Sequence, residues 1–133
     1  MRYLLDTNAV ISILNGTSAS VMRRLRHQSP EDVAISVVVT HELYYGAFKS
    51  RRSVQNVGLI DALRFTVLEL DKEDARKAGE IRALLASKGI QIGPYDVLIA
   101  GQASARDLIL VSNNLAEFRR VPGLQIEDWQ ADV

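Results

Sequence analysis

Short apolar runs alternate with longer segments of helical periodicity along the whole chain. The apolar runs are hydrophobic at successive positions, which is typical of strands buried on both faces of a parallel sheet. Strands are predicted at residues 3–5, 33–36, 65–70, 108–111 and 124–126. Helices are predicted at residues 9–14, 18–27, 37–49 and 54–63, from 72 to about 88, from 94 onwards and shortly after 114. This order predicts an α/β fold in a single domain over residues 1–133, a three-layer α/β/α sandwich with a parallel central sheet of four to five strands.

Several predicted helix ends carry recognisable capping residues. Asn8 is expected to cap the first helix, and Asp71 is expected to cap the fifth, with Asp74 in its third position. Pro94 suits the first turn of the next helix because proline has no N–H to leave unpaired. The fifth helix is expected to bury one apolar face, which consists of Ala75, Ala78, Ile81 and Leu85.

The composition narrows the functional classes. The chain has 133 residues with 16 basic and 16 acidic side chains, so its net charge is zero and argues against coating nucleic acid by bulk attraction. The absence of cysteine excludes disulfides, thiolate metal sites and a cysteine nucleophile. The first six residues contain no apolar run long enough for a signal peptide or a membrane span. We therefore expect no membrane association and a cytoplasmic location.

Three carboxylates lie in unusually apolar surroundings. Asp6 follows the first strand, Glu42 lies inside a mostly apolar helix, and Asp96 lies in the first turn of the most buried helix. Alone, Asp6 could cap a helix, Glu42 could pair with an arginine, and Asp96 could complement a helix N-terminus. Together they are expected at the carboxyl edge of the sheet, where α/β proteins bind ligands. A cluster of like charges needs a cation, and oxygen ligands favour Mg²⁺, with Mn²⁺ as the alternative ion.

Other polar and small residues accompany these acids. Ser112 and Asn114 follow the fourth strand, and their side chains either hold a metal-bound water or cap the next helix. His41 adjoins Glu42 but points about 100° away around the helix, so it is not expected to be the general base. Gly46 lies one turn after Glu42 and is expected to let this helix pack close to the sheet.

Five sequence blocks occur together in the order found in a known family. They are Leu5-Asp6-Thr7-Asn8, Glu42-Leu43 with Gly46-Ala47, Gly93-Pro94-Tyr95-Asp96 with Ile99-Ala100, Ser112-Asn113-Asn114 with Glu117-Phe118, and Val121-Pro122-Gly123-Leu124 with Glu127-Asp128-Trp129. With these blocks the chain resembles the PIN-domain ribonucleases, and it is most similar to the VapC-type toxins of bacterial toxin–antitoxin pairs. The resemblance covers nearly the whole chain.

The resemblance implies a Mg²⁺-dependent endoribonuclease that hydrolyses structured RNA, most often tRNA, and so inhibits translation. Asp6, Glu42 and Asp96 match the acidic metal-binding residues of the family. Asn114 falls where many relatives carry a fourth acid, so it is a candidate catalytic residue that lacks the charge. We therefore expect a single Mg²⁺ ion.

Further side chains are expected to support the acids or the substrate. Thr7 and Ser112 match hydroxyl positions beside the acids, and Asn8 belongs to the first sequence block. Arg82 matches a recurrent basic position and is expected either near the site or in a pair with an acid. Aromatic residues are only 6% of the chain, so base stacking is not expected to dominate RNA recognition.

The resemblance also implies partners. Similar toxins form homodimers and are held inactive by a small VapB-type antitoxin whose C-terminal segment wraps the toxin. The chain has no recognisable helix-turn-helix of its own, so contact with operator DNA is expected only through the antitoxin.

Other functional classes share part of this pattern. A phospho-accepting receiver domain is also an α/β/α sandwich, and Asp71 imitates its phosphorylated aspartate, but the paired acids and the late lysine are missing. A catalytically inactive PIN domain would bind RNA or a partner protein without turnover, and Asn114 leaves this alternative open. Metal chemistry alone does not separate a ribonuclease from a DNA nuclease.

Overall fold

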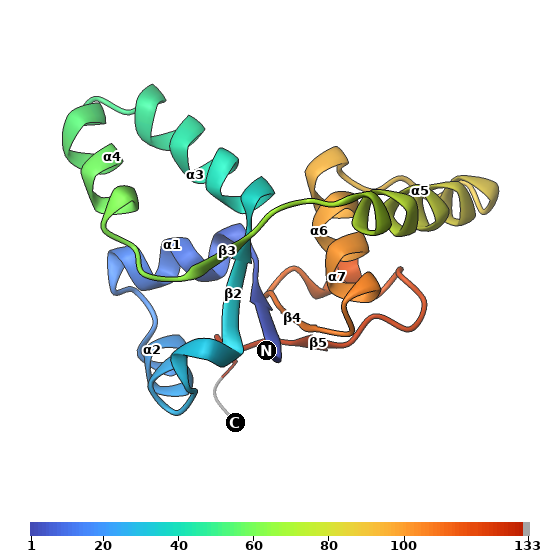
Figure 1. Cartoon of the computed structure of the whole chain (residues 1–133), viewed down its shortest axis with the longest axis horizontal. Helices are drawn as coiled ribbons and strands as arrows, with labels where there is room; N and C mark the ends of the chain where they lie inside the picture. The colour runs from blue at the N-terminus through green and yellow to red at the C-terminus, as the bar shows by residue number, and fades with distance from the viewer. Residues whose placement is uncertain (132–133) are drawn as a thin grey trace.

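A five-stranded parallel sheet forms the centre of the computed structural model, which describes residues 1–131 (Figure 1). The strand order is β3-β2-β1-β4-β5. The strands are β1 (Tyr3–Leu5), β2 (Val33–Ser36), β3 (Thr66–Leu68), β4 (Ile109–Val111) and β5 (Ile126–Glu127). The helices are α1 (Thr7–Asn15), α2 (Ala19–Arg26), the 3-10 turn η1 (Pro30–Asp32), α3 (Val37–Lys49), α4 (Ser53–Asp61), α5 (Lys72–Ser87), α6 (Pro94–Ala105) and α7 (Leu115–Phe118). The predicted parallel α/β architecture is confirmed.

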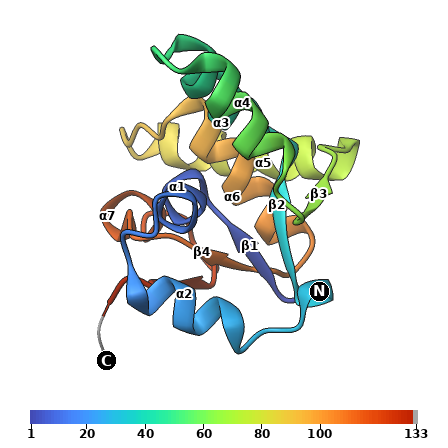
Figure 2. The same ribbon diagram turned by 90° about the vertical axis from the view of Figure 1, so that its left-hand side faces the viewer.

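The helices cover both faces of the sheet. Helices α1 and α2 lie on one side, whereas α5 and α6 pack against each other on the other side (Figures 1 and 2). Helices α3 and α4 form a pair that extends beyond the carboxyl ends of the strands (Figure 1). Within residues 1–131, no helix combines the length and the apolar composition needed to cross a membrane.

The central strand β1 has parallel neighbours on both sides, with Leu4 opposite Ala34 of β2 and Leu110 of β4. All three side chains are completely buried, which explains why these short runs are uniformly apolar. The chain builds outward from β1 in one direction through β2 and in the other through β4. This reversal creates a switch point at the carboxyl ends of β1 and β4, where such folds bind ligands.

Helices α5 and α6 approach each other unusually closely at Gly101. A Cβ atom on Gly101 would lie 2.6 Å from the backbone of Ala78, so the contact requires a residue without a side chain. The same pair of helices is held by Asp74, whose carboxylate is 1% exposed and accepts hydrogen bonds from Gln102 and Arg106. Because α6 carries Asp96 in its first turn, this packing also positions the predicted site.

Some predicted boundaries and faces are wrong. Helix α1 begins at Thr7, because Asp6 rather than Asn8 is its cap: the Asp6 carboxylate accepts a 2.9 Å hydrogen bond from the N–H of Ala9. Ala75 is exposed, and the charged Asp74 takes its expected buried position.

The predicted strand at residues 65–70 is shorter and less buried than expected. Only Thr66–Leu68 pair with β2, and Val67 is 44% exposed because β3 is an edge strand. The capping box at the start of α5 is confirmed, since Asp71 and Asp74 each accept a hydrogen bond from the backbone N–H of the other.

Candidate active site

Asp6 lies at the carboxyl end of the central strand and is 5% exposed. Its backbone N–H continues the ladder to Val111 of β4, and its side chain accepts hydrogen bonds from the N–H of Ala9 and from the Ser112 hydroxyl. Burial raises the pKa of Asp6, these hydrogen bonds oppose the rise, and the negative charge of Glu42 adds to it. Asp6 is therefore a helix cap and a member of an acidic cluster at the same time.

Glu42 reaches the same edge of the sheet from α3. This helix starts directly after β2, where the Ser36 hydroxyl accepts a 3.1 Å hydrogen bond from the N–H of Val38. The Thr7 hydroxyl donates a 3.0 Å hydrogen bond to Glu42 Oε1. This contact joins the first turn of α1 to α3, so Thr7 orients one of the predicted carboxylates.

Asp96 approaches from the first turn of α6 and shares a hydrogen bond with Glu117. Burial raises the pKa of Asp96 to about 7, with further contributions from this hydrogen bond and from the negative charges of Glu117, Glu42 and Asp6. Asp96 is therefore about half protonated at neutral pH, and its protonated carboxyl donates a hydrogen bond to Glu117.

Glu117 is a site residue whose role is not evident from the sequence. Its Oε1 accepts a 2.7 Å hydrogen bond from the N–H of Gly93, and its Oε2 accepts a 2.8 Å hydrogen bond from the Asn114 amide. Burial favours a higher pKa, but these donors and Asp96 outweigh it and lower the pKa of Glu117. The available signal was its spacing, three residues after Asn114 in a helix that follows a strand end.

The four carboxylates repel one another without closing around a single point. Among residues 1–131, no three acidic or histidine side chains converge as closely as the ligands of a bound metal. Asp6, Glu42 and Glu117 are instead each held by a local donor, as shown by the Thr7 contact to Glu42. The donor set is nevertheless all oxygen, and burial together with the neighbouring negative charges raises the pKa values of Asp6 and Asp96.

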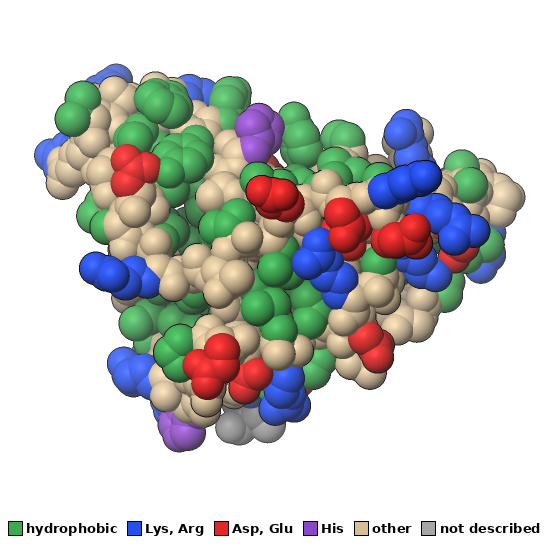
Figure 3. Space-filling view, in the orientation of Figure 1, with side chains coloured by type: hydrophobic (Ala, Val, Ile, Leu, Met, Phe, Trp, Pro, Cys, Tyr) green, Lys and Arg blue, Asp and Glu red, His purple; other side chains and the backbone are tan. Residues whose placement is uncertain are grey.

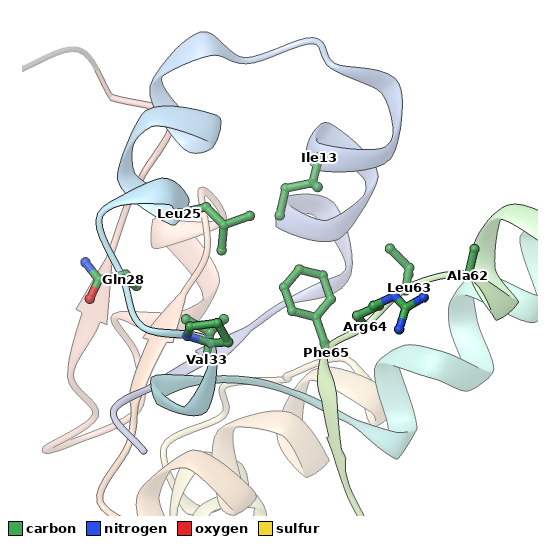
Figure 4. Close-up of a pocket in the computed structure, with 9 residues that line it drawn as sticks. Ile13, Leu25, Gln28, Val33, Ala62, Leu63, Arg64 and Phe65 are labelled. Carbon is green, nitrogen blue, oxygen red and sulfur yellow. The ribbon is translucent and has the colours of Figure 1, made fainter.

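A groove borders one of the acids, whereas an apolar pocket lies at the opposite end of the strands. An apolar pocket of about 310 Å³ receives Ile13, Leu25 and Phe65 near the amino ends of the strands, away from the carboxylates (Figure 4). A groove of about 350 Å³ runs between α1, α3 and α4 and includes Glu42 and Gly46 in its wall. Apart from its chain neighbours and the backbone of its own helix, no atom lies within 4 Å of a Cβ placed on Gly46, so the expected close packing of this glycine on the sheet is wrong.

Apolar side chains gather on the surface over α3 and α4, whereas acidic and basic side chains mix along α5 (Figure 3). The most exposed of these apolar residues are Tyr45, Phe48, Val54 and Leu59, which are 50–89% exposed. Exposed apolar surface of this kind is typical of a face that contacts a partner.

Known proteins resemble this chain over nearly its full length. The family model for the PIN domain matches residues 3–124. The tRNA(fMet)-specific endonuclease VapC of Salmonella typhimurium is 40% identical over 131 residues, which cover 97% of this chain and 98% of the relative. Ribonuclease VapC2 of Haemophilus influenzae is 38% identical over 131 residues, which again cover 97% of this chain and 98% of the relative. The chain belongs to the VapC family of PIN-domain ribonucleases.

Solved VapC structures share the fold. The crystal structure of DNA-bound VapBC from Salmonella typhimurium matches with a TM-score of 0.92 and 40% identity, covering 97% of this chain and 98% of that chain. VapBC2 from Rickettsia felis, bound to a DNA fragment from its promoter, matches with a TM-score of 0.89 and 35% identity, covering 97% and 99%. The resemblance noted from the sequence blocks is thereby confirmed.

The remaining predicted site residues of this VapC chain have different surroundings. Ser112 contacts Asp6 and accepts a hydrogen bond from the N–H of Asn114, so both residues border the acids. Asn8 is exposed. Arg82 is also exposed and forms no ion pair in the part of the chain that the structure describes, so the second of its two expected placements is not found there. A contact of Arg82 with substrate stays a prediction.

Proposed function

We propose that this VapC chain is an endoribonuclease that depends on a divalent cation and acts as the toxin of a toxin–antitoxin pair. The observation that carries the proposal is the gathering of Asp6, Glu42, Asp96 and Glu117 at the carboxyl edge of the sheet. Burial raises the pKa values of Asp6 and Asp96, and the negative charges of neighbouring carboxylates add to the rise, so a cation at this edge would favour the ionised carboxylates.

The donor chemistry fits Mg²⁺, with Mn²⁺ as the alternative, because all four side chains offer carboxylate oxygens. Asp6 and Asp96 are the residues we expect to hold the ion, and Glu42 would complete the set. When bound, the ion would lower the pKa of a water molecule and offset charge on the phosphoryl oxygens.

The protein's own side chains position the acids and accept the proton. Thr7 holds the Glu42 carboxylate by its hydroxyl, which leaves Glu42 placed to accept the proton that the attacking water loses. Ser112 orients Asp6, while Glu117 anchors the segment that leads from Gly93 into Asp96. Attack by water would leave a 5′-phosphate and a 3′-hydroxyl, so preference for RNA must come from substrate shape.

The identity of the substrate and the partners rests on relatives. A relative that is 40% identical is named a tRNA(fMet)-specific endonuclease, so we propose tRNA as the substrate and inhibition of translation as the consequence. Two structural relatives are VapBC complexes with DNA, which supports a VapB-type antitoxin that carries the DNA contact. The exposed apolar side chains on α3 and α4 are consistent with a homodimer or a bound antitoxin.

The test is cleavage of total cellular RNA by the purified protein with Mg²⁺ and with EDTA, followed by mapping of new 5′ ends. A few discrete cuts that carry 5′-phosphates and vanish with EDTA would support the proposal and identify the RNA. Intact RNA in both samples, from folded protein free of antitoxin, would instead favour an inactive PIN domain that only binds.

A further inference from the structure

Two aromatic rings meet at the surface beside the carboxylates. The ring centroids of His41 and Tyr95 are 5.3 Å apart, and the ring planes are inclined by 55°. The rings come from different helices, α3 and α6, which contact each other. Tyr95 is 45% exposed and His41 is also exposed. This His41–Tyr95 platform therefore presents aromatic surface to solvent and is not part of the core.

The platform stands at the rim of the candidate active site. His41 directly precedes Glu42, and Tyr95 directly precedes Asp96, so their Cα atoms lie about 3.8 Å from those of the acids while the side chains point about 100° away around each helix. The charge of Glu42 contributes to the raised pKa of Asp96, which places the two acids within electrostatic reach of each other. The exposed rings therefore flank the two acids on the surfaces of α3 and α6.

The other ring pairs of residues 1–131 do not offer such a surface at the acids. Tyr3 and Trp129 stack edge to face inside the core, where they are 5% and 2% exposed. Tyr44 and Phe48 both belong to α3, and the Tyr44 hydroxyl donates a hydrogen bond to Asp61. The His41–Tyr95 platform is thus the ring pair of the described chain that joins the two helices bearing Glu42 and Asp96.

We infer that the His41–Tyr95 platform stacks one unpaired RNA base adjacent to the cleavage position. The inference rests on the proposed ribonuclease function and adds a substrate contact to it. The chain has no net charge, and its acids repel phosphates, so overall electrostatic attraction does not hold the RNA. Base stacking does not depend on charge and would supply part of the missing binding free energy. The platform stacks a single base, so the rest of RNA recognition depends on the shape of the RNA.

The test compares two RNA-like octamers with equal backbone charge. One is octa-adenylate, and the other is an abasic ribose-phosphate octamer. Their affinities are measured by fluorescence anisotropy on protein carrying Asp6→Asn, a change intended to stop cleavage. We expect octa-adenylate to bind about tenfold more tightly than the abasic octamer, the effect of stacking a single base. Tyr95→Leu should remove this preference, whereas Tyr95→Phe should keep it.

The controls separate stacking from other roles of the same surface. Phe48→Leu removes an aromatic side chain that is 67% exposed on α3 but lies outside the platform, so it should leave the preference unchanged. His41→Leu should reduce the preference and serves as the second test if Tyr95→Leu does not fold. The difference between octamers should also persist as salt is raised, because stacking is not screened.

Three results would overturn the inference. Tyr95→Leu could weaken both octamers equally, or leave the preference intact, or change only the oligomeric state by size-exclusion chromatography with RNA binding unaffected. The last result would make the platform a protein contact. Wild-type cleavage of RNA is measured in parallel: cleavage without a base preference would reject the platform alone, whereas a base preference without cleavage would reject the proposed activity alone.

Discussion

Replacing Asp96 by asparagine should stabilise the cation-free protein at alkaline pH. Folding raises the pKa of Asp96 from 3.8 to about 7, so the unfolded chain loses this proton before the folded protein does. The folded protein therefore loses stability as the pH rises through the window from 3.8 to about 7. An asparagine amide has no proton to lose and still donates to Glu117, so Asp96→Asn escapes this loss.

The size of the effect follows from the pKa change. A tenfold change in proton affinity corresponds to about 1.4 kcal/mol, so the full rise corresponds to about 4 kcal/mol. The Asp96 carboxyl is only half-buried, and solvent screening reduces the effect by about half. We therefore expect Asp96→Asn to raise the free energy of unfolding by about 2 kcal/mol at pH 8 and by a few tenths at pH 4.

Urea unfolding in EDTA at pH 4 and pH 8 measures this difference directly. Glu31→Gln is a matched control, because Glu31 is exposed and lies outside the acidic cluster. Adding Mg²⁺ at pH 8 should reduce the advantage of Asp96→Asn, since a cation stabilises the ionised carboxylates of the wild type. Equal stabilities of wild type and Asp96→Asn at pH 8 would refute the claim that ionisation of Asp96 destabilises the folded protein.

Three further variants test the close contact at Gly101, the open surroundings of Gly46 and the ion pair between Arg106 and Asp74. Gly101→Ala should lower the free energy of unfolding by about 2 kcal/mol, because its Cβ would lie 2.6 Å from Ala78, whereas Gly46→Ala should raise it by up to about 1 kcal/mol, because no atom lies within 4 Å. A loss of stability in Gly46→Ala as large as in Gly101→Ala, measured by urea unfolding, would contradict this difference. Arg106→Met should cost about 3 kcal/mol at pH 7, because it leaves the buried carboxylate of Asp74 without its cation. Burial favours a higher pKa of Asp74, but the hydrogen bonds from Arg106, the Asp71 N–H and Gln102 together outweigh it and lower this pKa. The stabilisation is therefore present above pH 3.8 and is lost as the pH falls; a cost independent of pH between 3 and 7 would argue against it.

The strands and most helices were predictable because their signals are local. Leu4 and Leu110 lie in runs that are apolar at every position, and such runs suit only strands covered on both faces. The capping box of Asp71 and Asp74 also depends on residues three apart. The three carboxylates Asp6, Glu42 and Asp96 were selected because acids in apolar surroundings are costly without a function.

The missed features depend on contacts between distant residues. The role of Glu117 arises from the Gly93 N–H, which lies 24 positions earlier in the chain. The burial of Asp74 likewise requires Arg106, 32 positions later, and no local pattern shows that a charge will occupy an apolar face. Gly46 looked like a packing residue from its spacing alone, but its surroundings depend on how α4 returns beside α3.

Single-turnover cleavage of an initiator tRNA transcript by wild type and Asp96→Asn, both with Mg²⁺, tests the central claim most directly. If the cuts mapped in total cellular RNA lie in another RNA, that RNA is used instead of the initiator tRNA. The account predicts that Asp96→Asn is folded and more stable than wild type at pH 8, yet cuts slower by about a hundredfold or more. Equal cleavage rates for the two proteins would contradict the claim that this carboxylate cluster performs the reaction.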